Sequence, residues 1–232
     1  MNHSLTFPLM SMSLVFIFGS WNVQSQIVWT EPAFPTADDL VTLYYNSALG
    51  NGELQNVIPI YIHTGVITSA SSGPSDWQNV QTNWGSTDAN CLMSPEGNGV
   101  HSFDFNGLSL TDYYGIGGEI TIESLAMVFR NANGSLVGRN ADGSDIFLEV
   151  SSGSFSASLQ TPELGYAVLE IGETFEILGL TSESCSIDLL INDEVVATAE
   201  GTSIAHVFEA TIGGQFDITI LGDNGSGFAS DE

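Results

Sequence analysis

An aromatic segment between residues 58 and 84 carries the side chains of this chain best suited to recognition chemistry. In the run from Ile58 to His63, a period of two places Tyr61 and His63 on one face of a strand and the isoleucines on the other. Trp77 follows, among amide and hydroxyl side chains. A phenol, an imidazole and an indole that face solvent together match the apolar face and hydroxyl rim of a sugar ring. The segment therefore favours binding over catalysis.

The stretch 77–84 contains two tryptophans, and a strand there would decide which of them is exposed. In a strand, Trp77 shares its face with amide side chains, whereas Trp84 lies on the opposite face. We therefore expect Trp77 to be the exposed platform and Trp84 to lie in the core with its indole N–H bonded. The alternative is that Tyr61 and Trp77 only pack beneath a loop and that His63 is structural.

The chain is strongly acidic. Its 232 residues include 28 Asp and Glu against 2 Arg and no Lys, which gives a formal net charge of −26. Nucleic acids and anionic membrane surfaces are excluded as partners, because binding to either needs clustered Lys or Arg. The acids are spread over the whole sequence, so the simplest interpretation is solubility in a saline setting, where salt screens their repulsion.

The sequence predicts a secretory signal over residues 1–25. Its apolar region runs from about Leu9 to Phe18, and Val23-Gln-Ser25 predicts cleavage before Gln26. The apolar run is too short to span a bilayer, which needs about 20 residues. We therefore expect an exported protein, secreted or held at the cell surface, with no membrane insertion.

The rest of the chain predicts an all-β protein of two β-sandwich domains, because short alternating runs are separated by Gly, Asn, Ser and Asp. The segment 112–118 is expected to be a loop. The expected strands of the first domain, residues 26–152, are Leu40–Tyr45, Val57–His63, Trp77–Asn83, Val100–Phe105, Leu125–Arg130 and Ile146–Val150.

Beyond Ser151-Ser-Gly-Ser154 the spacing indicates a smaller, immunoglobulin-like sandwich over residues 153–232. Asn192-Asp193 and Gly213-Gly214 are expected to join neighbouring strands as hairpin turns. A final paired strand would begin about where the chain stops, so this domain is predicted to be incomplete at its C-terminus. Its expected strands are Phe155–Leu159, Thr174–Leu178, Ser186–Asn192, Glu194–Ala199, Ala205–Ala210 and Gln215–Leu221.

The run Asn140-Ala-Asp142-Gly-Ser-Asp145 places oxygen ligands at alternating positions, as in some calcium loops. It is shorter than the twelve-residue calcium loop and lacks the terminal Glu of that loop. Asn140, Asp142 and Asp145 are therefore only weak candidates for a calcium site, and a turn with capping side chains is the better interpretation. No other cofactor is indicated.

The cysteines and arginines are few enough to consider singly. Cys185 alternates with Ile187 and other aliphatic residues, which predicts an inward-facing free thiol, although a disulfide with Cys91 is open in an exported protein. Arg130 and Arg139 are the only bases in a chain rich in carboxylates. We expect each to form an ion pair.

Several of these residues fall in motifs that resemble a known group. The resemblance is to the starch-binding modules of carbohydrate-binding families 25 and 26, and it is closer to the N-terminal module of exported alpha-amylases of Bacteroidetes type. It covers residues 27–150 well and 153–225 more loosely. The motifs are Val41-Thr-Leu-Tyr-Tyr45, Tyr61-Ile-His63, Trp77, Met93, Ala126-Met-Val-Phe-Arg-Asn131 and Gly134-Ser135.

The resemblance implies a first domain that cradles an α-1,4-glucan and a second, immunoglobulin-like domain that precedes a catalytic barrel beyond residue 232. The insertion Ser69–Ser75 departs from the compact pattern of those modules. Carried over by position, the binding residues are Tyr61, His63 and Trp77, with Gln78, Asn79 and Asn131 as hydrogen-bonding neighbours.

Enzyme signatures are missing: the chain has no GxSxG, HExxH, CxxC or P-loop motif, so we expect no catalytic residues. The first hypothesis is non-catalytic binding of starch or a related α-glucan, as the accessory region of a secreted alpha-amylase. The second is a structural or adhesive surface protein without a sugar site. The third is an enzyme with a shallow active site in the first domain.

Overall fold

The computed structural model describes residues 26–161 and 166–232, so the predicted secretory signal over residues 1–25 lies outside the described residues. The protein is all-β, as the sequence predicts: strands dominate both halves, and within the described residues helical structure is limited to three short segments. Among the described residues, none of the helices has the length and apolar character needed to cross a membrane.

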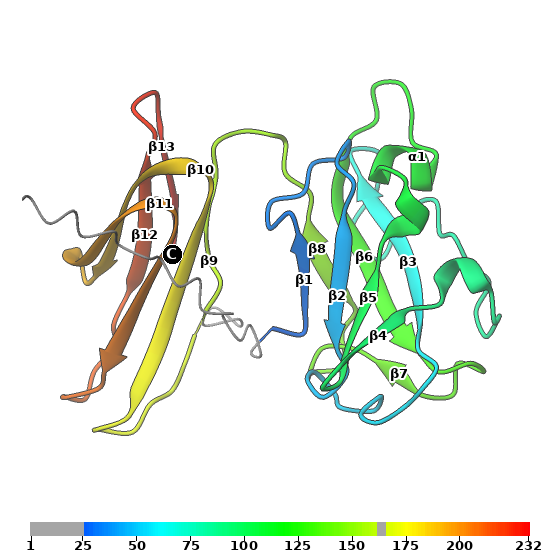
Figure 1. The fold of residues 1–232 in the computed structure, drawn as a ribbon, viewed down its shortest axis with the longest axis horizontal. Coiled ribbons are helices and arrows are strands. Elements are labelled where there is room, and N and C mark those ends of the chain that lie inside the picture. The colour runs from blue at the N-terminus through cyan, green and yellow to red at the C-terminus, as the bar shows by residue number, and fades with distance from the viewer. Residues whose placement is uncertain (1–25, 162–165) are drawn as a thin grey trace, which may run out of the picture.

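The first half forms a sandwich of two antiparallel sheets (Figure 1). One sheet has the strand order β1-β2-β5-β4. Alternation along β2 sends Leu43 and Tyr45 inward and leaves Tyr44 on the outer face, where it stacks on Trp29 of β1. The strands are β1 (Val28–Glu31), β2 (Thr42–Asn46), β4 (Ser94–Gly97) and β5 (Val100–Phe103).

The second sheet of the sandwich is built on the long antiparallel pair of β3 and β6. Tyr61 lies opposite Arg130 at one end of this pair, and Thr68 lies opposite Ile122 at the other. Both β7 and β8 pair with β6. This sheet carries the candidate site on its outer face. Its strands are β3 (Tyr61–Thr68), β6 (Ile122–Arg130), β7 (Val137–Gly138) and β8 (Ile146–Glu149).

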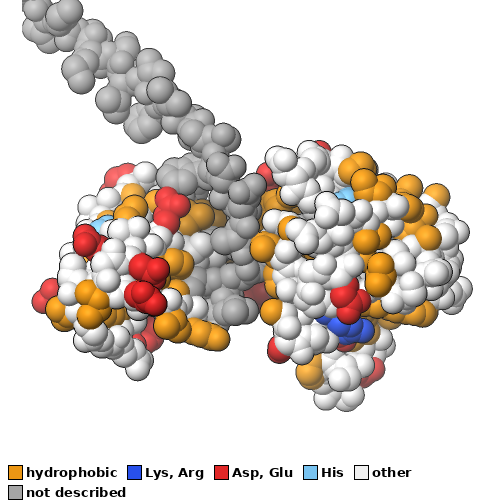
Figure 2. All heavy atoms as spheres, turned by 90° about the horizontal axis from the view of Figure 1, so that it is seen from below, with side chains coloured by type: hydrophobic (Ala, Val, Ile, Leu, Met, Phe, Trp, Pro, Cys, Tyr) orange, Lys and Arg blue, Asp and Glu red, His pale blue; other side chains and the backbone are white. Residues whose placement is uncertain are grey.

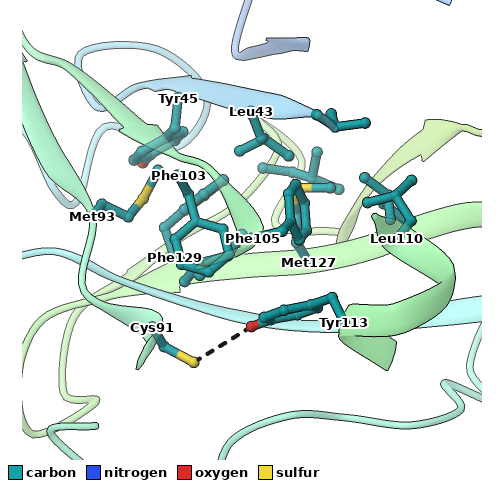
Figure 3. Close-up of a cluster of buried hydrophobic side chains, with 14 of the residues drawn as sticks. Leu43, Tyr45, Cys91, Met93, Phe103, Phe105, Leu110, Tyr113, Met127 and Phe129 are labelled. Carbon is teal, nitrogen blue, oxygen red and sulfur yellow. Dashed lines mark hydrogen bonds between the residues drawn. The ribbon is translucent and has the colours of Figure 1, made fainter. Parts of the chain in front are cut away.

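The core between the two sheets is rich in aromatic rings (Figure 3). Phe103, Phe105 and Tyr113 contact one another edge to face, and Phe129 stacks on Tyr45 with ring centroids 3.6 Å apart. Such rings bury large areas in preferred geometries. The Sγ atom of Cys91 lies 3.9 Å from the Tyr113 hydroxyl within this core.

The helical turns lie in the loops of the sandwich. The helix α1 (Leu110–Tyr114) begins at Ser109, whose side chain accepts a hydrogen bond from the Asp112 amide, and ends at Gly115 in the left-handed region. Two 3-10 turns span Ala89–Cys91 and Phe105–Gly107. The loop predicted over residues 112–118 is therefore wrong in its first half, because α1 extends into it.

The second half is one bent antiparallel sheet with the order β11-β10-β12-β13, and β9 pairs with β10. Two expected pairs of strands are in fact single long strands. β10 runs through the region where a break was expected, with a register shift between Leu180 and Cys185. The strands are β9 (Ala157–Leu159), β10 (Thr174–Ile191), β11 (Glu194–Glu209), β12 (Ile218–Asp223) and β13 (Phe228–Asp231).

The two predicted hairpin turns of the second half have different outcomes. Asn192-Asp193 joins β10 to β11, and both residues have positive φ, 51° and 65°, as a type I′ turn requires. Gly213-Gly214 lies in the connection from β11 to β12, which is not a hairpin because β10 separates these strands. The segment expected to lack a paired strand contains β13, which pairs with β12.

The core of the second half is small and mainly aliphatic. Ile177, Ile187, Leu189 and Ile220 are fully buried there, and Cys185 is buried beside them as predicted. No disulfide joins the two cysteines of the described chain, since both are free and buried. Large apolar side chains remain exposed on this half, among them Val168, Ile171, Ile212 and Phe228.

Charge is distributed as the composition predicts. Figure 2 shows acidic side chains on both halves and one basic patch, which lies over the first sandwich.

The two halves are joined near the start of the described chain, where the Gln26 side chain donates hydrogen bonds to the backbone and side-chain oxygens of Gln160.

Candidate functional site

The outer face of the β3–β6 sheet carries the candidate site, and alternation along β3 decides which residues reach it. Ile60 and Ile62 are fully buried in the core, so the neighbouring Tyr61 and His63 lie on the other face, as predicted. The alternation does not extend to Ile58, which was expected in the core. Ile58 is 73% exposed because β3 begins only at Tyr61.

Four aromatic rings on this face contact one another in succession, and we call them the aromatic strip: Trp84, His63, Trp77 and Phe147. The ring centroids of successive members are 5.1, 6.2 and 6.4 Å apart. Trp84 is 50% exposed and Phe147 41% exposed, while His63 and Trp77 are half-buried between them. The strip therefore offers ring surfaces to solvent on this face.

The segment that carries both tryptophans runs along the edge of β3 without forming the strand predicted over 77–83. Its Gln78 exchanges two backbone hydrogen bonds with Val66, at 2.8 and 3.0 Å, and the backbone N–H of Gln81 donates to the Thr64 carbonyl oxygen. Gly65 permits this approach, because a Cβ there would lie 2.9 Å from the Gln78 carbonyl oxygen. The segment is thereby held against the sheet with its indoles over the outer face.

The exposure of the two tryptophans differs from the prediction. Trp84, expected in the core, is the more exposed ring, and its indole nitrogen would be 2.9 Å from a Cβ added at Gly134. Trp77, expected to be the exposed platform, is half-buried and donates its Nε1–H to the Pro74 carbonyl at 3.1 Å. The prediction was wrong because a period of two does not apply outside a strand.

His63 is held in one orientation at the middle of the strip. Its Nδ1 lies 2.8 Å from the Thr82 hydroxyl, and the Trp84 ring meets it edge to face at 89°. Burial lowers the pKa of His63, and the nearby positive charge of Arg130 lowers it further. The imidazole is therefore neutral at neutral pH.

Tyr61 is the predicted platform residue that the structure does not place in the strip. It is only 8% exposed, and it pairs with Leu92 through an isolated bridge. Its ring covers the Arg130 guanidinium, whose central carbon lies 5.3 Å from the ring centroid. Tyr61 is thus covered on the face that carries His63, and the phenol was wrongly expected to face solvent.

Arg130 is fully buried and acts as a clamp beside the strip, because it lies opposite Tyr61 on the face that carries His63. Its guanidinium donates to the carbonyl oxygens of Asn131, Ala132 and Ser86. Within the described chain it has no carboxylate partner, so the expected ion pair of Arg130 is wrong. Because Ser86 belongs to the loop of Trp84, the clamp ties that loop to the turn that follows β6.

The amide side chains expected to bond a sugar are used within the fold. The Gln78 side chain donates to Asp76 Oδ1 at 2.7 Å, and the Asn79 side chain donates to the Tyr114 carbonyl at 2.6 Å. Asn131 Oδ1 accepts from two backbone amides of its own turn. These three residues shape the loops around the strip.

The weak calcium candidates form a capped turn, as the better interpretation predicted. The hydroxyl of Ser144 and then its backbone amide, which donates to Asp142 Oδ1, lower the Asp142 pKa. The Asn140 side chain donates to the Asp145 carbonyl. Asp145 is paired with Arg139, as expected for this arginine. Over residues 26–161 and 166–232, no group of three or more His, Cys, Asp or Glu side chains is placed to hold a metal ion.

Phe147, like Trp84, is a member of the strip that was not predicted as a binding residue. It lies on β8 opposite Ala126, on the same outer face as His63. Alternation in the run Ile146–Val150 contains this signal, because Ile146 is buried and its neighbour must then face outward.

Comparisons with known proteins do not identify a function for this face. No protein-family model matches the chain, and no curated protein matches it. Among solved structures, the chain is similar to the fibronectin type III-like modules of Clostridium thermocellum CbhA, with 10% sequence identity and a TM-score of 0.25. That similarity covers 88% of this chain and 92% of the other. Similarity at this level bears on neither the outer face nor its ligand.

Proposed function

We propose that the aromatic strip binds a polysaccharide, namely starch or a related α-glucan, without catalysis. The observation that carries the proposal is the succession of four contacting rings, contributed by β3, β8 and the segment between β3 and β4, on one outer face. The exposed rings of the strip can stack on the apolar face of a sugar unit. At about 1 kcal/mol for each ring contact, a few contacts suffice for a weak but specific site.

The chemistry around the strip favours a neutral polymer. The imidazole of His63 is neutral, and the guanidinium of Arg130 is buried and bonded to backbone carbonyl oxygens. A net charge of −26 repels anionic polysaccharides at a distance. An uncharged glucan is not repelled by the acidic protein and needs no positive charge for binding. It offers alternating CH faces and hydroxyl groups to the strip.

The proposal extends to an accessory role in an exported alpha-amylase, which rests on the sequence resemblance and on the predicted signal at residues 1–25. A binding module joined to a catalytic domain raises the effective concentration of that domain at its polymer. The second half of the chain would then connect the two.

Affinity electrophoresis in gels containing amylopectin tests the proposal. The wild-type protein is expected to be retarded, and Trp84→Ala should weaken binding about fivefold, as the loss of about 1 kcal/mol implies. Trp77→Ala, at the centre of the strip, should weaken it at least as much.

Phe228→Ala is the matched control, because Phe228 is a highly exposed aromatic residue on β13 in the second half. Its mobility should follow the wild type. Retardation that survives both tryptophan substitutions, or a wild-type protein that is not retarded, would overturn the sugar site.

A further inference from the structure

A cleft of about 800 Å³ lies between the two halves of the molecule. Figure 1 shows β1 and β8 of the first sandwich on the side that faces β9. The cleft is lined by residues of β1 and β8 on one wall and by residues of β9, β10 and β13 on the other. Its volume is within the range of about 300–1,000 Å³ typical of ligand sites, which often lie between domains.

One aromatic side chain belongs to both the cleft and the aromatic strip. Phe147 contacts Trp77 edge to face in the strip, and it also lines the cleft. The aromatic strip and the cleft therefore adjoin at Phe147. A linear ligand on the strip can extend past Phe147 toward the cleft.

The cleft repeats the chemistry of the strip. Trp29 lines it and is held by stacking on Tyr44, with ring centroids 5.3 Å apart and an angle of 9° between the rings. The polar lining consists of hydroxyl, amide and carboxylate groups, and among the described residues that line the cleft there is no Lys or Arg. Hydroxyls and carboxylates can accept hydrogen bonds from sugar hydroxyl groups. The polar members include Glu149, Ser152, Ser156, Ser158 and Asp231.

We propose that the cleft holds further sugar units of the same glucan chain that lies on the aromatic strip, with Trp29 as a second platform. This inference rests on the proposed function of the strip. Its consequence is a preference for long chains, because a short oligosaccharide fills only the strip and gains nothing from the cleft.

A bulky residue placed in the cleft provides the test. Ser230 is exposed on β13 and lines the cleft, so Ser230→Trp should obstruct it from the wall opposite β1 and β8. Ser226→Trp is the matched control, since Ser226 is exposed in the turn before β13 and lies outside the cleft lining. Trp29→Ala removes the second platform by a different route.

Titration calorimetry with malto-oligosaccharides of increasing length, from maltose upward, gives the readout on the full chain. The wild type and Ser226→Trp should bind long oligosaccharides more tightly than short ones. Ser230→Trp and Trp29→Ala should lose about fivefold in affinity for the long ones only, which is the contribution expected of one aromatic contact.

The outcomes separate the two proposals. Equal affinities of Ser230→Trp and Ser226→Trp for every length would overturn the cleft and leave the strip standing. A wild-type protein that binds no oligosaccharide and no amylopectin would overturn both. A variant that loses affinity for short and long chains alike would also contradict the cleft proposal, because the cleft is expected to act on long chains alone.

Discussion

The two halves of the chain differ in how they use aromatic side chains. The first sandwich buries rings such as Tyr45, Phe105 and Phe129 between its sheets and places a second set on an outer face. The second half has a core of a few aliphatic residues, and several of its large apolar side chains face solvent. A thick aromatic core fixes the sheet of the first half, and a fixed sheet can hold surface rings in defined positions.

Truncation of one buried residue in each half should have the largest effect and should separate the two. Phe129→Ala removes a fully buried ring stacked on Tyr45 and should destabilise the first sandwich by about 3–5 kcal/mol. Leu189→Ala should destabilise the second half by about 2–5 kcal/mol. Unfolding in guanidinium chloride, followed by tryptophan fluorescence and by far-UV circular dichroism, measures both.

The two probes report on different regions. The tryptophans of the described residues, Trp29, Trp77 and Trp84, all belong to the first sandwich, whereas circular dichroism reports on strands of both halves. Phe129→Ala should move the fluorescence transition, and Leu189→Ala should leave it in place. If both variants shift both probes together, the halves unfold as one cooperative unit and the contrast between them is broken.

A smaller effect is expected at the hairpin turn of the second half. Asp193 has a φ of 65°, a left-handed conformation in which a Cβ is unfavourable, and glycine is preferred there in a type I′ turn after Asn. Asp193→Gly should therefore stabilise the second half by about 0.5–1 kcal/mol. The circular dichroism transition should move to higher denaturant while the fluorescence transition stays. A decrease in stability would show that the aspartate side chain does more than occupy the turn.

The smallest effect should come from pH and should be confined to the first sandwich. Burial lowers the pKa values of His63 and His101 below the ordinary 6.5, so below that pH the unfolded chain binds more protons than the folded one. Their contribution to stability is complete above pH 6.5 and is lost as the pH falls through the lowered values. The carboxyl groups with lowered pKa, Asp76 and Asp142, act in a separate window below 3.8.

His101→Gln isolates the histidine effect from the general decrease in acid repulsion. The stability difference between the wild type and this variant should shift against the wild type as the pH falls from about 7.5 to about 5. The midpoint of the fluorescence transition measures it. If the wild type instead becomes more stable relative to the variant as the pH falls over this range, the result would contradict the lowered pKa of His101.

Local patterns in the sequence were sufficient for the fold class and for individual strands. Alternation placed Ile60, Ile62 and His63 correctly, and the Asn192-Asp193 pair identified its turn. The same patterns could not show that β10 continues through its register shift, because the residues that bridge the shift resemble those of a turn. Nor could they show that β12 pairs with β10 rather than with β11, since strand order depends on contacts between distant segments.

The candidate site was predicted in part for the same reason. His63 and Trp77 lie together on the face that was expected, but the exposure of Trp84 depends on a loop path fixed by hydrogen bonds to β3. The burial of Tyr61 depends on Arg130 and Leu92, which reach it from other segments. The alternation of side chains within residues 58–84 cannot predict either of these contacts.

The clamp formed by Arg130 has a consequence for the conditions in which the strip keeps its shape. Its partners are the face of the Tyr61 ring and three backbone carbonyl oxygens, which are not titratable groups. Buried attractions of this kind are also shielded little by dissolved ions. Mildly acidic pH and high salt concentration, which would weaken a surface ion pair, should leave the hydrogen bonds between Arg130 and the Trp84 loop unchanged.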